Sequence, residues 1–278
     1  VGTLGVLTRA DIAGVPRPSS RAALLLRFRH TAEACAAAVE LARDAEAVEI
    51  VSRSALELLR EHTDVLGGDR ESAALLIVEY AGRREDGPVS AAASSAANGW
   101  TLTASPVIAE ESAHIEQIWQ ARKALLPVIR RIAGDRGRPY SVVNDVGVPP
   151  VRLAELIEGA EAVFSRHGLI APIYGHAGSG NLHLRPLFPP GDHALVREVA
   201  REIYELVCGL GGTVSAEHGM GRLRAPFLEE EWGDRIVSYM RELKQIFDPD
   251  DLLNPGVMFA SCGGGFRHCG WEVAPVLS

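Results

Sequence analysis

The 278-residue chain has few cysteines, no long apolar run and no excess of basic residues. Four cysteines do not make the disulfide framework of a small secreted protein. No stretch of about 18 apolar residues predicts a transmembrane helix. The net charge of −8 argues against nucleic acid as the main partner. The first residues lack an initiator methionine and the features of a signal peptide, so we expect a missing beginning and a cytoplasmic protein.

The cysteines have ordinary interpretations. Cys35 and Cys208 fall within helical patterns, which predicts that they are buried as small hydrophobic side chains. Cys262 and Cys269 lie in a glycine-rich tail with six residues between them. Iron–sulfur ligation uses shorter, clustered spacings, so this tail alone is not expected to hold a cluster.

Two glycine-rich segments carry the most informative polar residues. They are residues 174–183 (YGHAGSGNLH) and 215–221 (SAEHGMG). If the strands around the first segment fold back about Ser179 and Gly180, His176 and His183 face each other with Cβ atoms about 5 Å apart. Two imidazoles at that spacing can bind one ion, with Glu217 as a third ligand. Two histidines and one carboxylate leave a coordination position open, as in catalytic metal sites.

The same residues also allow a structural interpretation. A histidine beside a glycine turn is often only a hydrogen-bonded polar residue. His176, His183 and Glu217 could therefore bind a metal that merely braces the hairpin, in a module without catalytic activity. A zinc hydrolase is a further alternative, but the chain lacks a helical His-Glu-x-x-His element.

The pattern of apolar and polar residues predicts a mixed α+β fold with antiparallel strands. Strands are expected at residues 1–8, 23–28, 48–51, 73–80, 100–103, 140–145, 169–176, 181–185 and 214–217. Helices are expected at residues 32–42, 55–62, 111–132, 153–167 and 193–210, and from 221 to about 247. Thr31 and Asp192 are expected to cap two of these helices, Pro127 to break a third, and residues 83–98 to form a loop.

Four segments, in order, resemble the C-terminal domain of FAD-linked oxidases of the vanillyl-alcohol oxidase and p-cresol methylhydroxylase group. They are residues 1–8, 176–183, 217–221 and 247–256. The branch that fits includes D-lactate dehydrogenase, D-2-hydroxyglutarate dehydrogenase and the glycolate oxidase flavin subunit. One departure is Ser179, where many relatives carry an acid. This position is expected at the tip of the turn, so the difference leaves the ligand assignment intact.

The resemblance implies a ferredoxin-like antiparallel sheet with helices on one face, plus a C-terminal helical segment. It implies four parts: the terminal strand of a missing FAD-binding domain (1–15), a substrate-binding cap domain (16–220), a helical segment returning to the flavin (221–259) and a glycine-rich tail (260–278). It also implies an iron–sulfur domain or subunit as a possible partner, and peripheral placement at the inner membrane through an electron-transfer partner.

The resemblance further implies an FAD-dependent dehydrogenase or oxidase of D-2-hydroxy acids of the D-lactate or glycolate type. His176, His183 and Glu217 would bind a divalent metal, expected to be zinc, and His218 would be the general base. A base with a pKa near neutrality suits removal of the hydroxyl proton, and the flavin accepts the hydride because no side chain can.

Other roles follow from the same resemblance. Arg122 would clamp the substrate carboxylate, for which a planar guanidinium is suited. Asn181 would bond to the substrate or hold the turn. Thr3, Gly5 and Asn254 would contact an FAD bound mainly by the missing domain.

A second cation found in the hydroxyglutarate enzyme is absent here. Val143 and Asn144 stand at the corresponding positions. A substrate with a second carboxylate is therefore less expected, unless another cation replaces the missing one. The candidates are Arg185, Arg222 and Arg224. The sequence leaves the substrate, the metal, the electron acceptor and the oligomeric state open.

Overall fold

The computed structural model describes residues 2–60, 66, 70–83 and 87–259, without the side chains of residues 132–136. The tail with Cys262 and Cys269 lies outside the described residues, as do the last two residues of the predicted helix 55–62.

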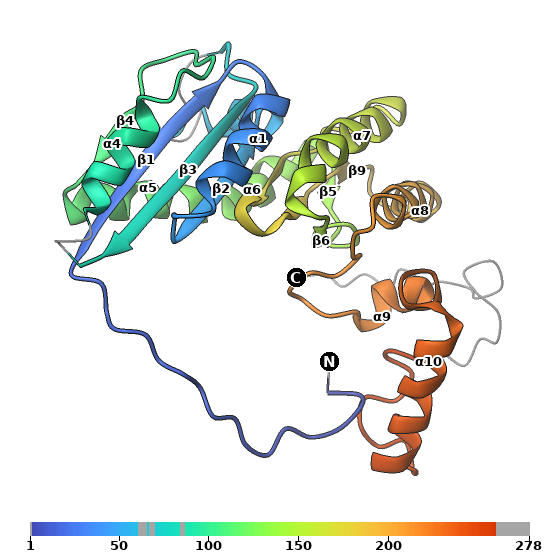
Figure 1. The fold of residues 1–278 in the computed structure, drawn as a ribbon. Coiled ribbons are helices and arrows are strands. Elements are labelled where there is room, and N and C mark those ends of the chain that lie inside the picture. Colours follow the sequence, from blue (N-terminus) through green and yellow to red (C-terminus); the bar gives the residue numbers. More distant parts are fainter. Residues whose placement is uncertain (1, 61–65, 67–69, 84–86, 260–278) are drawn as a thin grey trace.

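A seven-stranded antiparallel sheet forms the centre of the fold, with the order β4-β1-β3-β2-β7-β8-β6 (Figure 1). Its strands are β1 (Ser20–Phe28), β2 (Ala47–Ser52), β3 (Ala74–Gly82), β4 (Val107–Ala109), β6 (Val146–Gly147), β7 (Ile173–His176) and β8 (Asn181–Leu184). The short strands β5 (Arg138–Pro139) and β9 (Leu187–Phe188) pair separately. The predicted α+β class is confirmed. The two halves of the sheet meet where β2 pairs with β7 through only two residue pairs.

The helices lie on both faces of this sheet. They are α1 (Thr31–Leu41), α2 (Arg53–Leu59), α4 (Pro88–Ala96), α5 (Ser112–Lys123), α6 (Leu125–Arg136), α7 (Leu153–Arg166), α8 (His193–Gly209), α9 (Gly221–Arg224) and α10 (Leu228–Phe247). Leu24 and Leu26 of β1 pack into the larger core, which includes residues of α1, α4, α7 and α8. Ala23 and Leu25 pack into a second core with α2, α5 and α6.

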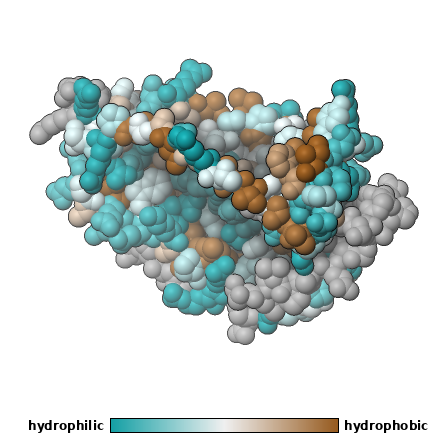
Figure 2. All heavy atoms as spheres, turned by 90° about the horizontal axis from the view of Figure 1, so that it is seen from below, coloured by the Kyte–Doolittle hydropathy of each residue, from teal (hydrophilic) through white to brown (hydrophobic). Residues whose placement is uncertain are grey.

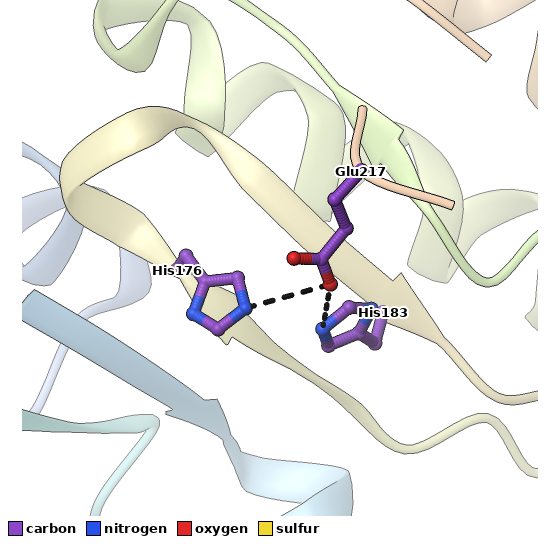
Figure 3. A group of neighbouring side chains, drawn as sticks. All are labelled: His176, His183 and Glu217. Carbon is purple, nitrogen blue, oxygen red and sulfur yellow. Dashed lines mark ion pairs between the residues drawn. The ribbon is translucent and has the colours of Figure 1, made fainter. Parts of the chain in front are cut away.

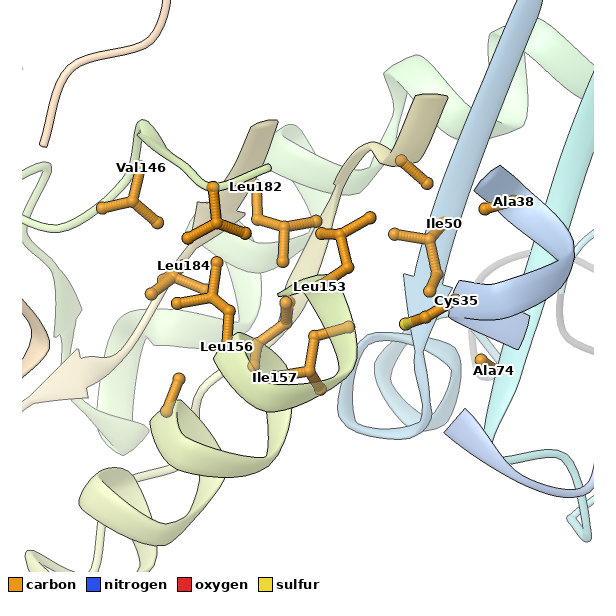
Figure 4. Close-up of a cluster of buried hydrophobic side chains, with 14 of the residues drawn as sticks. Cys35, Ala38, Ile50, Ala74, Val146, Leu153, Leu156, Ile157, Leu182 and Leu184 are labelled. Atoms are coloured by element: carbon orange, nitrogen blue, oxygen red, sulfur yellow. The ribbon is translucent and has the colours of Figure 1, made fainter. Parts of the chain in front are cut away.

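The expected placement of helices on one face is therefore corrected. Strands such as β1 are apolar at successive positions, so both of their faces need cover. Figure 4 shows part of the larger core, where Leu153, Leu156 and Ile157 of α7 meet Leu182 and Leu184 of β8.

Several predicted elements differ from the structure in the first half of the chain. The predicted loop 83–98 contains helix α4, which begins with Pro88 at its first turn. Residues 100–103 form only an isolated bridge, between Leu102 and Phe28. The strand that follows is β4, and it pairs with β1. The predicted helix 111–132 is divided at Ala124, because the ring of Pro127 clashes with the carbonyl of Lys123 one turn earlier.

One of the two predicted helix caps is confirmed. The Asp192 carboxylate accepts a hydrogen bond from the backbone nitrogen of Leu195 at 3.0 Å. The Thr31 cap is wrong, because Thr31 is already the first residue of α1 and the preceding His30 makes no side-chain cap.

Three predicted strands are loops in the structure. Residues 2–8 form no strand, because they pair with no described strand and leave Val6 and Leu7 exposed. Residues 140–145 bend, and 214–217 form a loop after an isolated bridge at Thr213. The backbone nitrogens of Glu217 and His218 donate to the Asp145 side chain, so they are not available to a neighbouring strand.

The C-terminal segment is helical as expected, in the pieces α9 and α10 with a short turn between them. Gly233 has a left-handed conformation and interrupts α10. Exposed apolar side chains follow one another along this helix at Trp232, Ile236, Tyr239 and Leu243. Figure 2 shows the molecule from below, with hydrophobic side chains exposed among polar ones. Among the described helices, none combines the length and apolar character needed to cross a membrane.

Candidate metal and substrate site

The hairpin of β7 and β8 brings the two predicted histidine ligands together in a register that differs from the expected one. His176 pairs with Asn181, and Tyr174 pairs with His183, so the histidines are diagonal rather than directly opposite. They still share a face of the sheet, and their ring centroids lie 5.3 Å apart. The turn needs glycine at Gly180, where an added Cβ would lie 2.0 Å from the carbonyl oxygen of Val148.

Both histidines and Glu217 point toward one position (Figure 3). The distance to Glu217 Oε1 is 3.7 Å from His176 Nε2 and 3.5 Å from His183 Nε2. Two ligands about 2.1 Å from a tetrahedral ion are about 3.4 Å from each other. Glu217 therefore lies at about the separation from each histidine that a shared ion would require, and the three possible ligand atoms lie within 4.8 Å of one another.

The other ring nitrogen of each histidine is held by the protein. Nδ1 of His176 donates to the carboxylate of Glu49 on β2. Nδ1 of His183 donates to the backbone oxygen of Asn144 at 2.8 Å. Metal-binding histidines usually donate this second N–H to a carboxylate or a carbonyl, which leaves Nε2 free for the ion.

These contacts change the acidity of the groups involved. Burial alone would raise the pKa of Glu49, but the hydrogen bond from His176 and the charge of Arg122 hold that pKa below its usual range. The hydrogen bond to Glu49 raises the pKa of His176, against the effect of burial. Burial lowers the pKa of His183, outweighing its bond to Asn144. His183 therefore favours the neutral form that binds metal.

Asp145 organises the loop that carries Glu217 and His218. Its side chain is fully buried. It accepts hydrogen bonds from the backbone nitrogen of His218 at 2.8 Å and of Glu217 at 3.2 Å. It also accepts from Ser215 Oγ at 3.2 Å and from Asn181 Nδ2 at 3.1 Å. One carboxylate therefore joins the hairpin to the loop.

His218 lies beside the three ligands. Its Nε2 is 3.3 Å from Glu217 Oε1, and its Nδ1 is 3.7 Å from Asp145 Oδ2. Nearly half of its side chain is exposed. A buried carboxylate on one side of the ring and an accessible nitrogen on the other suit a group that accepts a proton and becomes charged.

Arg122 and Asn181 both lie close to the proposed ligands, but each already forms hydrogen bonds with other residues. Arg122, on α5, forms an ion pair with Glu49 at 2.6 Å and lies over the ring of Tyr174. The Asn181 amide nitrogen donates to Asp145 and to the backbone oxygen of Val146. The amide oxygen of Asn181 is buried without a described partner.

The structure also distinguishes between the three arginines that were candidates for binding a second substrate carboxylate. Arg185 is buried two residues after His183 and donates to Ser141 Oγ at 3.2 Å. It has no acidic partner among the described residues, and its Nε is unpaired. Arg224 is also buried, but it bonds to Asn144 Oδ1 and the backbone oxygen of Gly219. Arg222 is exposed.

A cavity of about 480 Å³ opens beside the ligands. Its lining includes His176, Glu217, Asn181, Val148, Thr213 and Ala216. A larger cavity of about 1280 Å³ lies elsewhere, next to Glu79 and Trp119, and no metal-binding group found among the described residues lines it. The smaller cavity is therefore the one associated with the candidate chemistry.

The three predicted flavin contacts occupy another part of the structure. Thr3 and Asn254 line one small cavity of about 280 Å³ near α10. Asn254 Nδ2 donates to the backbone oxygen of Gly2, so the first described residues lie against the closing motif. The Thr3 hydroxyl is buried without a described partner. Gly5 is partly exposed and lines no cavity described here.

Comparisons with known proteins identify the family. The profile described as "FAD linked oxidases, C-terminal domain" matches residues 17–258. The chain belongs to this family of FAD-linked oxidase C-terminal domains. The resemblance drawn from the four sequence segments is thereby confirmed.

Individual relatives and solved structures that resemble this FAD-linked oxidase domain agree with the family assignment. Glycolate oxidase subunit GlcD of Bacillus subtilis is 28% identical over 271 residues, covering 93% of this chain and 55% of that protein. D-lactate dehydrogenase of Archaeoglobus fulgidus is 30% identical over 257 residues, covering 92% and 55%. The fold is similar to that of 4-ethylphenol oxidase from Gulosibacter chungangensis, with a TM-score of 0.62, 15% identity and coverage of 87% and 54%. The chain spans about half the length of these relatives.

Two residues of the site were not assigned a role from the sequence. Glu49 stands in the apolar strand sequence Ala47-Val48-Glu49-Ile50-Val51. An acid at a buried strand position needs a partner, so the sequence could have marked Glu49 as a residue with a specific contact. Asp145 was not singled out, because its contacts with a loop about 70 residues away leave no local pattern.

Proposed function

We propose that this chain is the substrate- and metal-binding half of an FAD-dependent dehydrogenase or oxidase of D-2-hydroxy acids, of the D-lactate or glycolate type. One observation carries the proposal. The Nε2 atoms of His176 and His183 converge on Glu217, while their Nδ1 atoms are held by Glu49 and Asn144. Such an arrangement is typical of a catalytic metal site with its supporting contacts, and it supports the proposal.

The residues present fit a divalent metal, proposed to be zinc. The donor set is two imidazoles and a carboxylate, the spacing suits a tetrahedral ion, and a fourth position is left for substrate. When bound, the ion would lower the pKa of the substrate hydroxyl and orient it.

The residues also fit a minor contribution to an FAD site, from Thr3 and Asn254 and, as the sequence implies, from Gly5. The buried Thr3 hydroxyl lacks a described partner, and the small cavity beside it can accept one edge of a ligand. The flavin would accept the hydride from the substrate carbon. The remaining contacts are assigned to a flavin-binding domain outside this chain.

His218 is proposed to take the hydroxyl proton at Nε2. Asp145 faces its Nδ1 and would stabilise the charged imidazole that results. The backbone hydrogen bonds from Glu217 and His218 to Asp145 hold this loop, so the base and the metal ligand keep a fixed separation.

Two side chains are proposed to bind the substrate. Arg122 uses Nε and one terminal nitrogen for Glu49, which leaves its other terminal nitrogen to contact the substrate carboxylate. The unpaired amide oxygen of Asn181 can accept a hydrogen bond from a substrate held at the metal.

The whole protein would extend beyond this chain. We propose the division stated above: residues 1–15 belonging with a flavin-binding domain, a cap at 16–220, a helical return at 221–259, and a tail at 260–278. An iron–sulfur domain or subunit is the proposed electron-transfer partner. The proposed location is the cytoplasm, with peripheral association at the inner membrane through that partner.

The test is to produce this chain together with the flavin-binding segment encoded beside it. Reduction of an artificial dye would be measured with D-lactate, glycolate and D-2-hydroxyglutarate. Turnover of glycolate, or of a D-acid and not of its L-isomer, is the expected result. A metal-loaded, flavin-loaded protein that oxidises none of them would contradict the proposal and favour a metal-braced structural module.

A further inference from the structure

One buried carboxylate contacts both the proposed metal site and the proposed substrate cation. Glu49 on β2 is 5% exposed. Its Oε1 accepts the Nδ1 hydrogen of His176 on β7, and its Oε2 accepts a hydrogen bond of 2.8 Å from Nε of Arg122 on α5. Glu49 therefore joins three elements, including strands from the two halves of the sheet.

The two histidine ligands depend on such contacts to different degrees. The His183 side chain is 9% exposed, so packing restricts its ring. The His176 side chain is 41% exposed, so packing on that ring is incomplete. Beside the backbone pairing, the contact that sets the orientation of the His176 ring is its hydrogen bond to Glu49.

We infer that Glu49 is a positioning residue of this site, which orients His176 toward the metal and holds Arg122 at a fixed distance from it. The inference rests on the proposed function. Loss of the Glu49 carboxylate would let the His176 ring rotate and would leave Nδ1 without its acceptor. Metal affinity should then fall by about 10- to 100-fold, the usual effect of removing such a supporting contact.

The chain offers a matched control in Glu79. This residue lies on β3, on the same face of the sheet, and is 2% exposed. Like Glu49, it binds a side chain of α5, in this case Nε1 of Trp119, and an arginine, Arg21. The described partners of Glu79 include none of the three proposed metal ligands, so its replacement removes a comparable buried carboxylate without touching the site.

The experiment measures zinc affinity of this chain by competition with a chromophoric chelator. The variants are Glu49→Gln, Glu49→Asp and the control Glu79→Gln. Glutamine keeps the shape of the side chain but places an NH₂ group against one of the two donors, His176 Nδ1 or Arg122 Nε. Aspartate is too short to reach both donors. Thermal unfolding checks that each variant is folded, and the visible spectrum of the cobalt-loaded protein reports the ligand geometry.

Both Glu49 variants should bind zinc about 10- to 100-fold more weakly than the parent chain, with an altered cobalt spectrum, while Glu79→Gln stays within about threefold. The inference is overturned if both Glu49 variants stay within about threefold, or if Glu79→Gln loses as much affinity as they do. Failure of the parent chain to bind zinc or cobalt would instead overturn the proposed metal site, and the inference with it.

Discussion

The imidazole rings of His183 and His218 are stacked, with centroids 5.7 Å apart and planes 10° apart. The two rings belong to segments separated by more than thirty residues, one on β8 and one in the loop held by Asp145. Because both Nε2 atoms lie within 3.5 Å of Glu217 Oε1, the proposed metal ligand and the proposed base face the same small space. A hydroxyl bound to the ion there would be within reach of the base.

The purified chain is expected to bind one divalent ion, zinc in the first instance. His183→Ala should remove most of it, because the remaining two ligands make a weak site. Elemental analysis after exchange into metal-free buffer is the measurement. His114→Ala, on the exposed side of α5, is the control and should keep its metal. Equal metal content in the parent and His183→Ala proteins would contradict the assignment.

His218→Ala in the complete enzyme is expected to lower turnover of a D-2-hydroxy acid by about 10²- to 10⁴-fold, the usual contribution of a general base. Steady-state kinetics and metal analysis are done on the same sample. Metal content should stay near normal. If the variant loses its metal and shows no separate effect on turnover, His218 is a ligand rather than the base.

Asp145→Asn is expected to lower the free energy of unfolding by about 2–4 kcal/mol, since a buried charged acceptor of several hydrogen bonds is replaced by a group that brings its own donors. Urea unfolding followed by circular dichroism measures the change. Asp192→Asn is the matched control, because asparagine caps a helix about as well as aspartate. A similar loss in both variants would mean that the hydrogen bonds to Asp145 contribute no more to stability than the helix cap made by Asp192.

Arg185→Met in the complete enzyme is expected to lower kcat/KM by about 10- to 100-fold, because a buried guanidinium without an acidic partner is suited to a substrate carboxylate. The kcat/KM of Arg185→Lys should lie between those of the parent enzyme and Arg185→Met. Arg222→Met, which replaces an exposed arginine, should change kcat/KM little. A loss with glycolate and with D-2-hydroxyglutarate alike indicates the carboxylate next to the hydroxyl. A loss with the dicarboxylate alone indicates the second carboxylate. No loss with either excludes the role.

This chain alone is not expected to bind FAD tightly or to oxidise substrate. Its cavity at Thr3 and Asn254 is small, and no described helix start there offers a glycine-rich site for the pyrophosphate. The exposed apolar side chains along α10 should also promote self-association. Gel filtration with excess FAD, followed by an absorbance spectrum, is the measurement. A yellow equimolar complex that is bleached by D-lactate would show that the flavin site lies within this chain.

The sequence predicted which polar side chains come together better than it predicted the secondary structure around them. The histidine pair and Glu217 were found because their residue types and glycine turns leave a local pattern. The predicted register of the hairpin was wrong by two residues, because the glycine-rich turn is centred one residue earlier than expected. Both registers place His176 and His183 on one face of the sheet, so the two side chains lie near each other despite the error.

The missed features depend on distant contacts. Residues 214–217 have the composition of a strand, but several of their backbone donors bond to distant or local side chains instead of a neighbouring strand: Val214 N donates to Glu231 and Glu217 N donates to Asp145. Helix α4 was hidden in a segment rich in serine and alanine, where packing of Ala92 against the core supplies the stability that the sequence pattern does not show. The ion pair of Glu49 with Arg122 joins residues 73 positions apart, so it leaves no local pattern.

The narrow pairing of β2 with β7 gives the proposed ion a second effect. The two halves of the sheet share two backbone residue pairs at this junction, and the Glu49–His176 bond crosses it beside them. An ion that fixes His176 to His183 and Glu217 would act as a cross-link next to this narrow junction. Because a ligand that binds only the folded state stabilises it, removal of the ion would loosen the fold as well as stop the chemistry. A chelator would then behave toward this protein as a mild denaturant.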